Sequence, residues 1–211
     1  MNNQRVYLTV LLIAWMAFAQ VAVAGKLLEL AVNDKRGIYT VHIDMTIHAA
    51  PEHVYDVLTD YEQLHRLNPS ITESERLPAS NKGLVRVRTR IQDCVLIFCV
   101  DFVRVENVRE VQAGHLTAET DPQASDFDYG KAVWRVESLG DYSRVIFEAK
   151  LQPGFALPPV IGPYVMKRKL RTEVLTSFRN LECIAKNNAA HLASAIMQDD
   201  DTNRHFQQCN S

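Results

Sequence analysis

The sequence "GIYTVHIDMTIHAAPEHVYDVLTDYEQLHRLNP", residues 37–69, places a strand directly before a helix and a second short apolar turn. Over residues 37–48 every second side chain is apolar, which is typical of a strand with one buried face. Pro51 suits the first position of a helix, because its missing N–H would have no partner there. Leu64 and Leu67 then form a short apolar edge before the next proline. The stretch predicts a strand, a helix and a half-helix in immediate succession.

The residues that follow read mostly as antiparallel sheet. In "LVRVRTRI", residues 84–91, apolar and arginine side chains alternate, which is the pattern of strands with one face in water. The three arginines, Arg86, Arg88 and Arg90, are either an anion site or a solvated sheet face. The regular alternation favours the solvated face.

A long helix is predicted from about Pro163 to Lys186, because its apolar residues gather in one stripe at helical spacing. An antiparallel sheet with one wet face must bury its other face, and this helix is the one large apolar partner. We therefore predict an α+β helix-grip fold. A curved antiparallel sheet of about six to seven strands wraps around the C-terminal helix, two short helices follow the first strand, and a cavity lies between sheet and helix.

The chain divides into four predicted segments. Residues 1–24 have one basic residue, an apolar run and an Ala-Val-Ala exit, which is typical of a secretory signal peptide. The alternative is an uncleaved membrane anchor, since the apolar run is about long enough to cross a bilayer. Residues 25–36 are a lead-in, residues 37–187 form the ligand-binding domain, and residues 188–211 form a polar, flexible tail.

Charge argues against nucleic-acid binding. Residues 1–24 contain one basic and no acidic residue, so the rest of the chain carries a net charge of −3, against −2 for the whole chain. That balance offers no general attraction to a phosphate backbone.

All four cysteines lie after the predicted signal peptide, and an exported protein meets an oxidising compartment. Four cysteines allow three pairings. We expect Cys94 to pair with Cys99 across a hairpin and Cys183 with Cys209 in the tail; the alternative is four unpaired thiols. No C-x2-C spacing is present, so no metal site is predicted.

Two blocks carry a family resemblance. "IHAAPEHVYDVLTDYEQLHRLNPSI" and "FDYGKAVWRVESLGDYSRVIFEAKLQPGFALPP" are similar to the two signature regions of the START-like helix-grip (SRPBCC) superfamily, in its coenzyme Q-binding and polyketide cyclase/dehydrase branch. The resemblance covers roughly residues 37–186 and implies the helix-grip fold with an apolar ligand. The chain departs from the soluble members of this branch in its apparent export and in the Cys94/Cys99 pair.

We predict that inward apolar side chains line the cavity, although each of them alternatively fills the core. The ligand-binding candidates are Leu64, Leu67, Val85, Val87, Phe102, Trp134, Phe147, Phe155, Tyr164, Leu170, Val174 and Phe178. Lys167 and Arg171 lie near the helix start and are candidates for a polar head group or an anionic membrane surface, or else are a solvated flank. No nucleophile, phosphate loop or metal spacing rises above chance, so neither a catalytic residue nor a cofactor is predicted.

The leading hypothesis is a binding protein, periplasmic or secreted after signal-peptide cleavage, that holds a hydrophobic small molecule such as a lipid, quinone or polyketide-like compound. A cyclase/dehydratase-type enzyme acting in the same cavity is the alternative. A third possibility is a scaffold with a solid core that acts through its surface.

Overall fold

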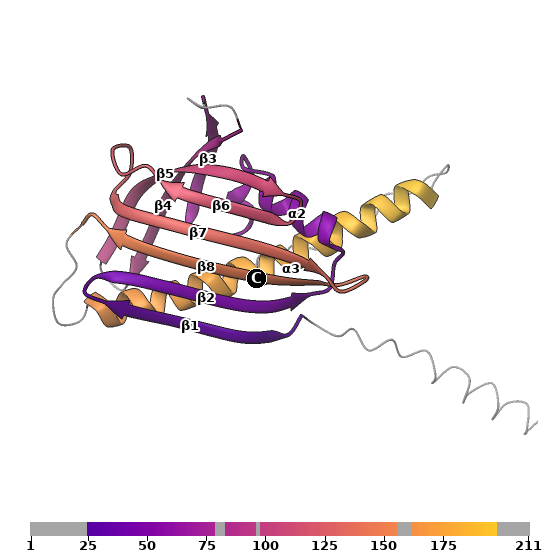
Figure 1. Cartoon of the computed structure of the whole chain (residues 1–211), viewed down its shortest axis with the longest axis horizontal. Coiled ribbons are helices and arrows are strands. Elements are labelled where there is room, and N and C mark those ends of the chain that lie inside the picture. The colour runs from indigo at the N-terminus through magenta and orange to yellow at the C-terminus, as the bar shows by residue number, and fades with distance from the viewer. Residues whose placement is uncertain (1–24, 79–82, 96–97, 156–161, 198–211) are drawn as a thin grey trace, which may run out of the picture.

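The structure is a computed structural model that describes residues 25–78, 83–95, 98–155 and 162–197. It contains one unclosed antiparallel sheet, in the strand order β1-β2-β8-β7-β6-β5-β4-β3, with a long helix beneath it (Figure 1). The predicted α+β helix-grip class is confirmed. The elements in chain order are β1 (Leu27–Lys35), β2 (Ile38–Ile47), α2 (Pro51–Thr59), η1 (Leu64–Arg66), β3 (Ile71–Leu77), β4 (Val85–Val95), β5 (Phe98–Gln112), β6 (His115–Thr120), β7 (Phe127–Ser138), β8 (Ser143–Pro153) and α3 (Gly162–Met197).

The described sheet has eight strands rather than six to seven, because residues 25–36 do more than lead into the domain. They contain β1, which pairs with β2 as a hairpin. The connection is Arg36-Gly37, with φ values of 58° and 80°. Positive φ at both turn residues matches the twist of a two-residue hairpin, and glycine adopts it without strain.

The helix α3 is also longer than predicted. It begins at Gly162 and continues to Met197, through the first part of the segment that was predicted to be a flexible tail. Residues 188–197 are rich in alanine, the residue with the highest helix propensity, which explains the extension. The rest of that tail, residues 198–211, lies outside the described residues. Within the described residues no helix combines the length and apolarity that crossing a membrane requires.

The core sits at one end of the space between sheet and helix. Helix α3 packs against α2, β1 and β2. Phe178 and Leu181 of α3 are at most 1% exposed, and Ile43, Ile47 and Val145 of the facing sheet are fully buried. Burying apolar area of this kind supplies most of the free energy of folding.

Side-chain amides fasten η1 to α3. Asn180 donates from Nδ2 to the Leu67 carbonyl oxygen at 3.0 Å, in a buried hydrogen bond. Asn68 donates from Nδ2 to Ser177 Oγ at 3.1 Å and to the Glu173 carbonyl oxygen at 3.3 Å. The short helix that the sequence predicted is therefore held as a plug against the long one.

A second contact fastens the α2 region to the sheet. The hydroxyls of Tyr55 and Tyr61 donate to the two carboxylate oxygens of Glu110 on β5, at 3.1 and 3.0 Å. Burial, together with the hydrogen bond to this carboxylate, raises the pKa of Tyr61. Glu110 therefore joins β5 to α2 and to the loop that follows α2.

Replacing Asn180 by leucine should destabilise the fold. Asn180→Leu keeps most of the side-chain volume but leaves the buried Leu67 carbonyl without this donor, which costs about 1–3 kcal/mol. Urea unfolding measures the change. Arg179→Leu, at the exposed neighbouring position, should stay within about 0.5 kcal/mol of the parent; equal effects of both variants would contradict the fastening role.

Candidate functional site

The inner face of the sheet, the face toward α3, is built in levels that run across neighbouring strands. The register places Ile43, Phe147, Trp134 and Leu116 opposite one another on β2, β8, β7 and β6. Cross-strand partners point to the same side of a sheet. The Trp134 ring lies 4.2 Å from that of Phe147 and is stacked at 5.6 Å on that of Phe178 from α3. Sheet and helix are in direct contact at this level.

The adjacent level is made of small side chains. Ala118, Ala132 and Ala149 lie in register on β6, β7 and β8. A methyl group extends far less from the sheet than an indole or phenyl ring. This alanine level therefore leaves more space beneath α3 than the aromatic level beside it.

A second aromatic group lies beyond the small residues. Phe102, Phe127 and Phe155 have ring centroids 5.1–6.0 Å apart. Along β7, Ala132 and Gly130 fall between Trp134 and Phe127. On β7 the inner face is therefore small-sided between the two aromatic groups, whereas the strands beside Gly130 carry Leu151 and the buried Tyr39 in register with it.

Solvent exposure supports an incompletely filled space. Trp134, Phe147, Ala132 and Ala149 are only half-buried, although all four belong to the face that points toward α3. Packed interiors leave few voids, so a filled space would bury these side chains as it buries Val145. These side chains are therefore less completely covered than the core residues Ile43 and Val145.

Two charged side chains also belong to the inner face. Arg104 and Glu106 of β5 pair with Thr89 and Val87 of β4. Arg104 Nε lies 3.2 Å from Glu106 Oε2, without hydrogen-bond alignment, and this buried Nε–H has no hydrogen-bond partner in the part of the chain that the structure describes. A buried donor without a partner carries a cost that a ligand oxygen relieves. Sequence reasoning missed this pair; the signal was its register with the inward residues of β4.

The structure distributes the predicted ligand-binding residues over three places. Leu67 is buried and Leu64 half-buried where η1 meets the core. Val85 and Val87 belong to a second small cluster that includes Tyr61. The aromatic level and the α3 stripe contain Trp134, Phe147, Leu170, Val174 and Phe178, and the second aromatic group contains Phe102 and Phe155.

Tyr164 does not join these groups. It lies in the first turn of α3 and is 66% exposed. Its exposure shows that it is not part of the buried stripe of that helix. Its predicted contact with a ligand stays a prediction.

Lys167 and Arg171, the predicted head-group residues, lie on either side of Lys169 in the sequence, and Lys169 forms ion pairs. Lys167 is half-buried and Arg171 is exposed. Lys169, between them, bonds to Asp93 of β4 and to Glu173 at 2.6 Å. Burial alone would lower the pKa of Lys169, but hydrogen bonds to these carboxylates raise it. This cation therefore ties the start of α3 to the sheet.

The predicted hairpin disulfide is confirmed. Cys94 and Cys99 are register partners on β4 and β5 and are bonded to each other. Cys183 is disulfide-bonded as well. Its predicted partner, Cys209, lies outside the described residues. Among the residues that the structure describes, no cluster of three His, Cys, Asp or Glu side chains suits a metal ion.

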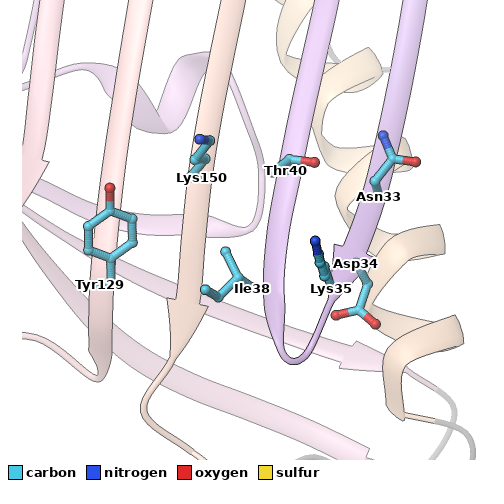
Figure 2. A pocket seen from close by; sticks show the side chains of 7 residues that line it. All are labelled: Asn33, Asp34, Lys35, Ile38, Thr40, Tyr129 and Lys150. Atoms are coloured by element: carbon cyan, nitrogen blue, oxygen red, sulfur yellow. The ribbon is translucent and has the colours of Figure 1, made fainter.

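A pocket of about 400 Å³ lies on the outer side of the sheet, away from α3 (Figure 2). Thr40 and Lys150 are register partners there, on β2 and β8, and α3 lies behind them. Its lining residues are Asn33, Asp34, Lys35, Ile38, Thr40, Tyr129 and Lys150. It lies on the outer face, and Ile38 and Tyr129 are exposed, so this pocket is not the predicted cavity between the sheet and α3.

The arginine face of β4 is a solvated ion-pair network. Arg86 pairs with Asp121 at 2.6 Å, and Arg88 bonds to Glu73 and Glu75, each at 3.0 Å. The third arginine, Arg90, is bidentate on Asp101 at 2.8 and 2.6 Å and also reaches Glu73. Each guanidinium already has a carboxylate partner, which leaves little attraction for an added anion.

Comparison with known families and structures gives one consistent result. The family model described as polyketide cyclase / dehydrase and lipid transport matches residues 39–185. A search among curated proteins found no match.

The solved structures that the fold resembles have low sequence identity. TTHA0849 from Thermus thermophilus has a TM-score of 0.55 at 19% identity, covering 74% of this chain and 99% of that one. The Zhui aromatase/cyclase from Streptomyces sp. R1128 gives 0.53 at 14%, with 75% and 98% covered. A STAR-related lipid transfer protein from Xanthomonas axonopodis gives 0.54 at 16%, with 74% and 98% covered. At these identities the likeness establishes the fold alone.

Truncating Trp134 should destabilise the protein. Trp134→Ala removes the ring that joins Phe147 and Phe178, and we expect a loss of about 3–4 kcal/mol, in the lower part of the range for tryptophan because the ring is half-buried. Chemical denaturation measures it. Tyr164→Ala, an aromatic truncation at an exposed position, should cost less than about 0.5 kcal/mol. A small loss for Trp134→Ala would show that the sheet and helix do not depend on this contact.

The outer ion pairs predict a pH dependence. Hydrogen bonds from Arg90 and then Gln92 lower the pKa of Asp101 to about 2. An unfolded aspartate titrates near 3.9, so the stabilising effect is present above about pH 4 and is lost as the pH falls toward 2. The carboxyl carbon shift of Asp101, followed by NMR, measures this pKa. Arg90→Gln should return it toward its ordinary value; an unchanged pKa would rule out Arg90 as the cause.

Proposed function

The chain belongs to the polyketide cyclase / dehydrase and lipid transport family, and we propose that it binds a hydrophobic small molecule between the inner face of the sheet and α3. The ligand class is a lipid, a quinone or a polyketide-like compound. The observation that carries the proposal is the alanine level, where Ala132 and Ala149 are only half-buried on the face toward α3 and lie beside the aromatic level.

The binding free energy would come mainly from burying apolar surface. At about 25 cal/mol per Å², roughly 400 Å² of apolar area removed from water contributes about 10 kcal/mol before the cost of association. Rings at both ends of the alanine level offer flat apolar walls to such a ligand. No reactive group is needed for this kind of binding.

A polar end of the ligand would meet Arg104 and Glu106. The Arg104 Nε–H lacks a hydrogen-bond partner among the described residues, and Glu106 provides acceptor oxygens beside it. A hydroxyl or carbonyl oxygen near this pair would be held by a charge-assisted hydrogen bond. Such a ligand is an amphiphile with one oxygen-bearing end, not a pure hydrocarbon.

The same pair supports the alternative function, an enzyme of the cyclase/dehydratase type. A glutamate within an apolar space is a candidate general base, and an adjacent guanidinium is a candidate for stabilising an enolate. Turnover of a polyketone substrate that is lost in Glu106→Gln, with binding retained, would favour the enzyme over the carrier.

We place the protein in the periplasm or outside the cell after cleavage of residues 1–24. The apolar run with its Ala-Val-Ala exit and the Cys94–Cys99 disulfide support export, since disulfides persist in oxidising compartments. Lys167 and Arg171 would then face an anionic membrane surface while the ligand is exchanged. An uncleaved anchor at the same membrane remains the alternative.

Filling the alanine level should abolish binding. Ala149→Leu adds three carbons to the inner face, whereas Lys150→Leu changes the next residue of β8, which belongs to the outer face and lines the outer pocket. Native mass spectrometry of protein purified from its own compartment should show a co-purifying apolar molecule in the parent and in Lys150→Leu, and at least tenfold less in Ala149→Leu. Binding lost in Lys150→Leu alone would move the site to the outer pocket. Absence of any apolar molecule from the parent would support the solid scaffold.

A further inference from the structure

Residue Gly25 is held by the most deeply buried carboxylate of α3. The Gly25 backbone nitrogen donates to Glu182 Oε1 at 2.8 Å, and Glu182 is only 8% exposed. A hydrogen bond between residues 157 positions apart fixes where the chain enters the fold. The entry point is also the residue that directly follows the Ala-Val-Ala exit.

The neighbouring residue anchors the same entry point. Lys26 donates its backbone N–H to Thr46 Oγ1 at 3.0 Å, and its carbonyl oxygen accepts from the Thr46 N–H at 2.9 Å. Gly25 is packed so closely that an added Cβ would lie 2.4 Å from the Thr46 carbonyl oxygen and 2.6 Å from Glu182 Oε2. The Thr46 carbonyl oxygen is backbone, so a side chain at residue 25 would force the chain entry to shift and the Glu182 carboxylate to move aside.

We infer that Ala24–Gly25 is the processing site, and that cleavage creates an N-terminal ammonium that docks on Glu182 as a partly buried ion pair. Hydrolysis breaks the Ala24–Gly25 peptide bond: water supplies the hydroxyl of the Ala24 carboxyl group and a proton to the Gly25 amine. The second proton passes from that carboxyl group to the amine at neutral pH. The reaction is that of a membrane peptidase that recognises small side chains. The inference rests on the proposed export, and not on the proposed ligand.

The environment of Glu182 suits a cation that has several N–H donors. Its contacts with other described residues all go to Oε1, which also accepts from the His48 N–H at 3.3 Å and Lys186 Nζ at 2.9 Å. The other oxygen, Oε2, lies beside Gly25. Before cleavage Gly25 offers one neutral N–H; afterwards it offers three on a charged group, enough to reach both oxygens. Charge-assisted hydrogen bonds are about twice as strong as neutral ones.

The other titratable groups nearby do not replace the ammonium. Lys186 is 40% exposed, so its charge is largely solvated, and His48 Nδ1 is 3.9 Å from Oε1. The docked ammonium would therefore be the least solvated partner of the carboxylate. It would also join the start of the mature chain to the middle of α3, the helix that closes the core.

The first experiment identifies the mature N-terminus. The full chain is expressed with export, recovered from the periplasm or medium, and measured by intact mass and N-terminal sequencing. The expected first residue is Gly25. A chain that begins at any other residue, or that keeps residues 1–24, overturns the inference while leaving the ligand site untouched.

The second experiment tests docking with four proteins. Chains that begin at Gly25 and at Ala24 are each prepared with and without Glu182→Gln. Starting at Ala24 restores the amide at residue 25 and moves the charge one residue away. The parent that begins at Gly25 should unfold roughly 3 °C or more above the one that begins at Ala24, and Glu182→Gln should remove the difference. Glu173→Gln, the same change earlier on α3, should preserve it.

A third measurement applies even if Glu182→Gln fails to fold. The α-amine of the chain that begins at Gly25 should react with an amine-directed N-hydroxysuccinimide ester at least fivefold more slowly than that of the chain that begins at Ala24. Gly25→Ala, which cannot approach Glu182, should react at the faster rate. Equal unfolding temperatures or equal labelling rates in the two parent chains overturn docking. Loss of ligand binding in Ala149→Leu would leave all of these results unchanged, so the two proposals fail independently.

Discussion

One helix has to cover a sheet that is far wider than itself. Eight strands at about 4.8 Å spacing span about 34 Å, whereas a helix with its side chains is about 10 Å across. Helix α3 lies against β1 and β2 at one side of the sheet and also contacts β7 through Phe178 and β4 through Lys169. The other elements of the fold determine how the rest of the inner face is covered.

Other segments of the chain cover part of this face, and polar contacts hold these segments in place. Helix α2 and η1 close one end, with Glu110 holding two tyrosines and Asn180 holding the Leu67 carbonyl. At the start of α3, Lys169 bonds to Asp93 on the fourth strand. Burial of apolar area favours this closure but is non-directional. The hydrogen bonds fix the geometry of the closed ends. Between the two ends, the inner face carries the alanine level, in which Ala132 and Ala149 are half-buried.

Much of this fold could be predicted from the sequence, because its signals are local. The alternation over residues 37–48, the proline at the start of α2 and the apolar stripe of α3 each specify one element. The strand β1 was missed because Leu27 and Leu28 are exposed and break the alternation, and because Arg36-Gly37 was not recognised as a hairpin turn. The extension of α3 was missed because polar residues concealed its helix propensity.

The site was harder to predict than the fold, because it depends on register. Strand pairing and the rotation of α3 bring Trp134, Phe147 and Phe178 together. No local sequence pattern contains this information. No local pattern marks the residues of the alanine level, because only strand pairing places them in register. Tyr164 was chosen for its aromatic ring, but its position in the first turn of α3 leaves it exposed.

Arginine side chains have different partners on the two faces of β4 and β5. On the outer face, each of three arginines has a carboxylate partner near water, where such a pair contributes little to stability, although the buried Nε–H of Arg86 has no hydrogen-bond partner among the described residues. On the inner face, Arg104 has one carboxylate neighbour that is not aligned with its buried Nε–H. A buried donor without a partner is costly to the fold. The sequence pattern displays the three outer arginines, whereas the inner position of Arg104 follows only from the strand register.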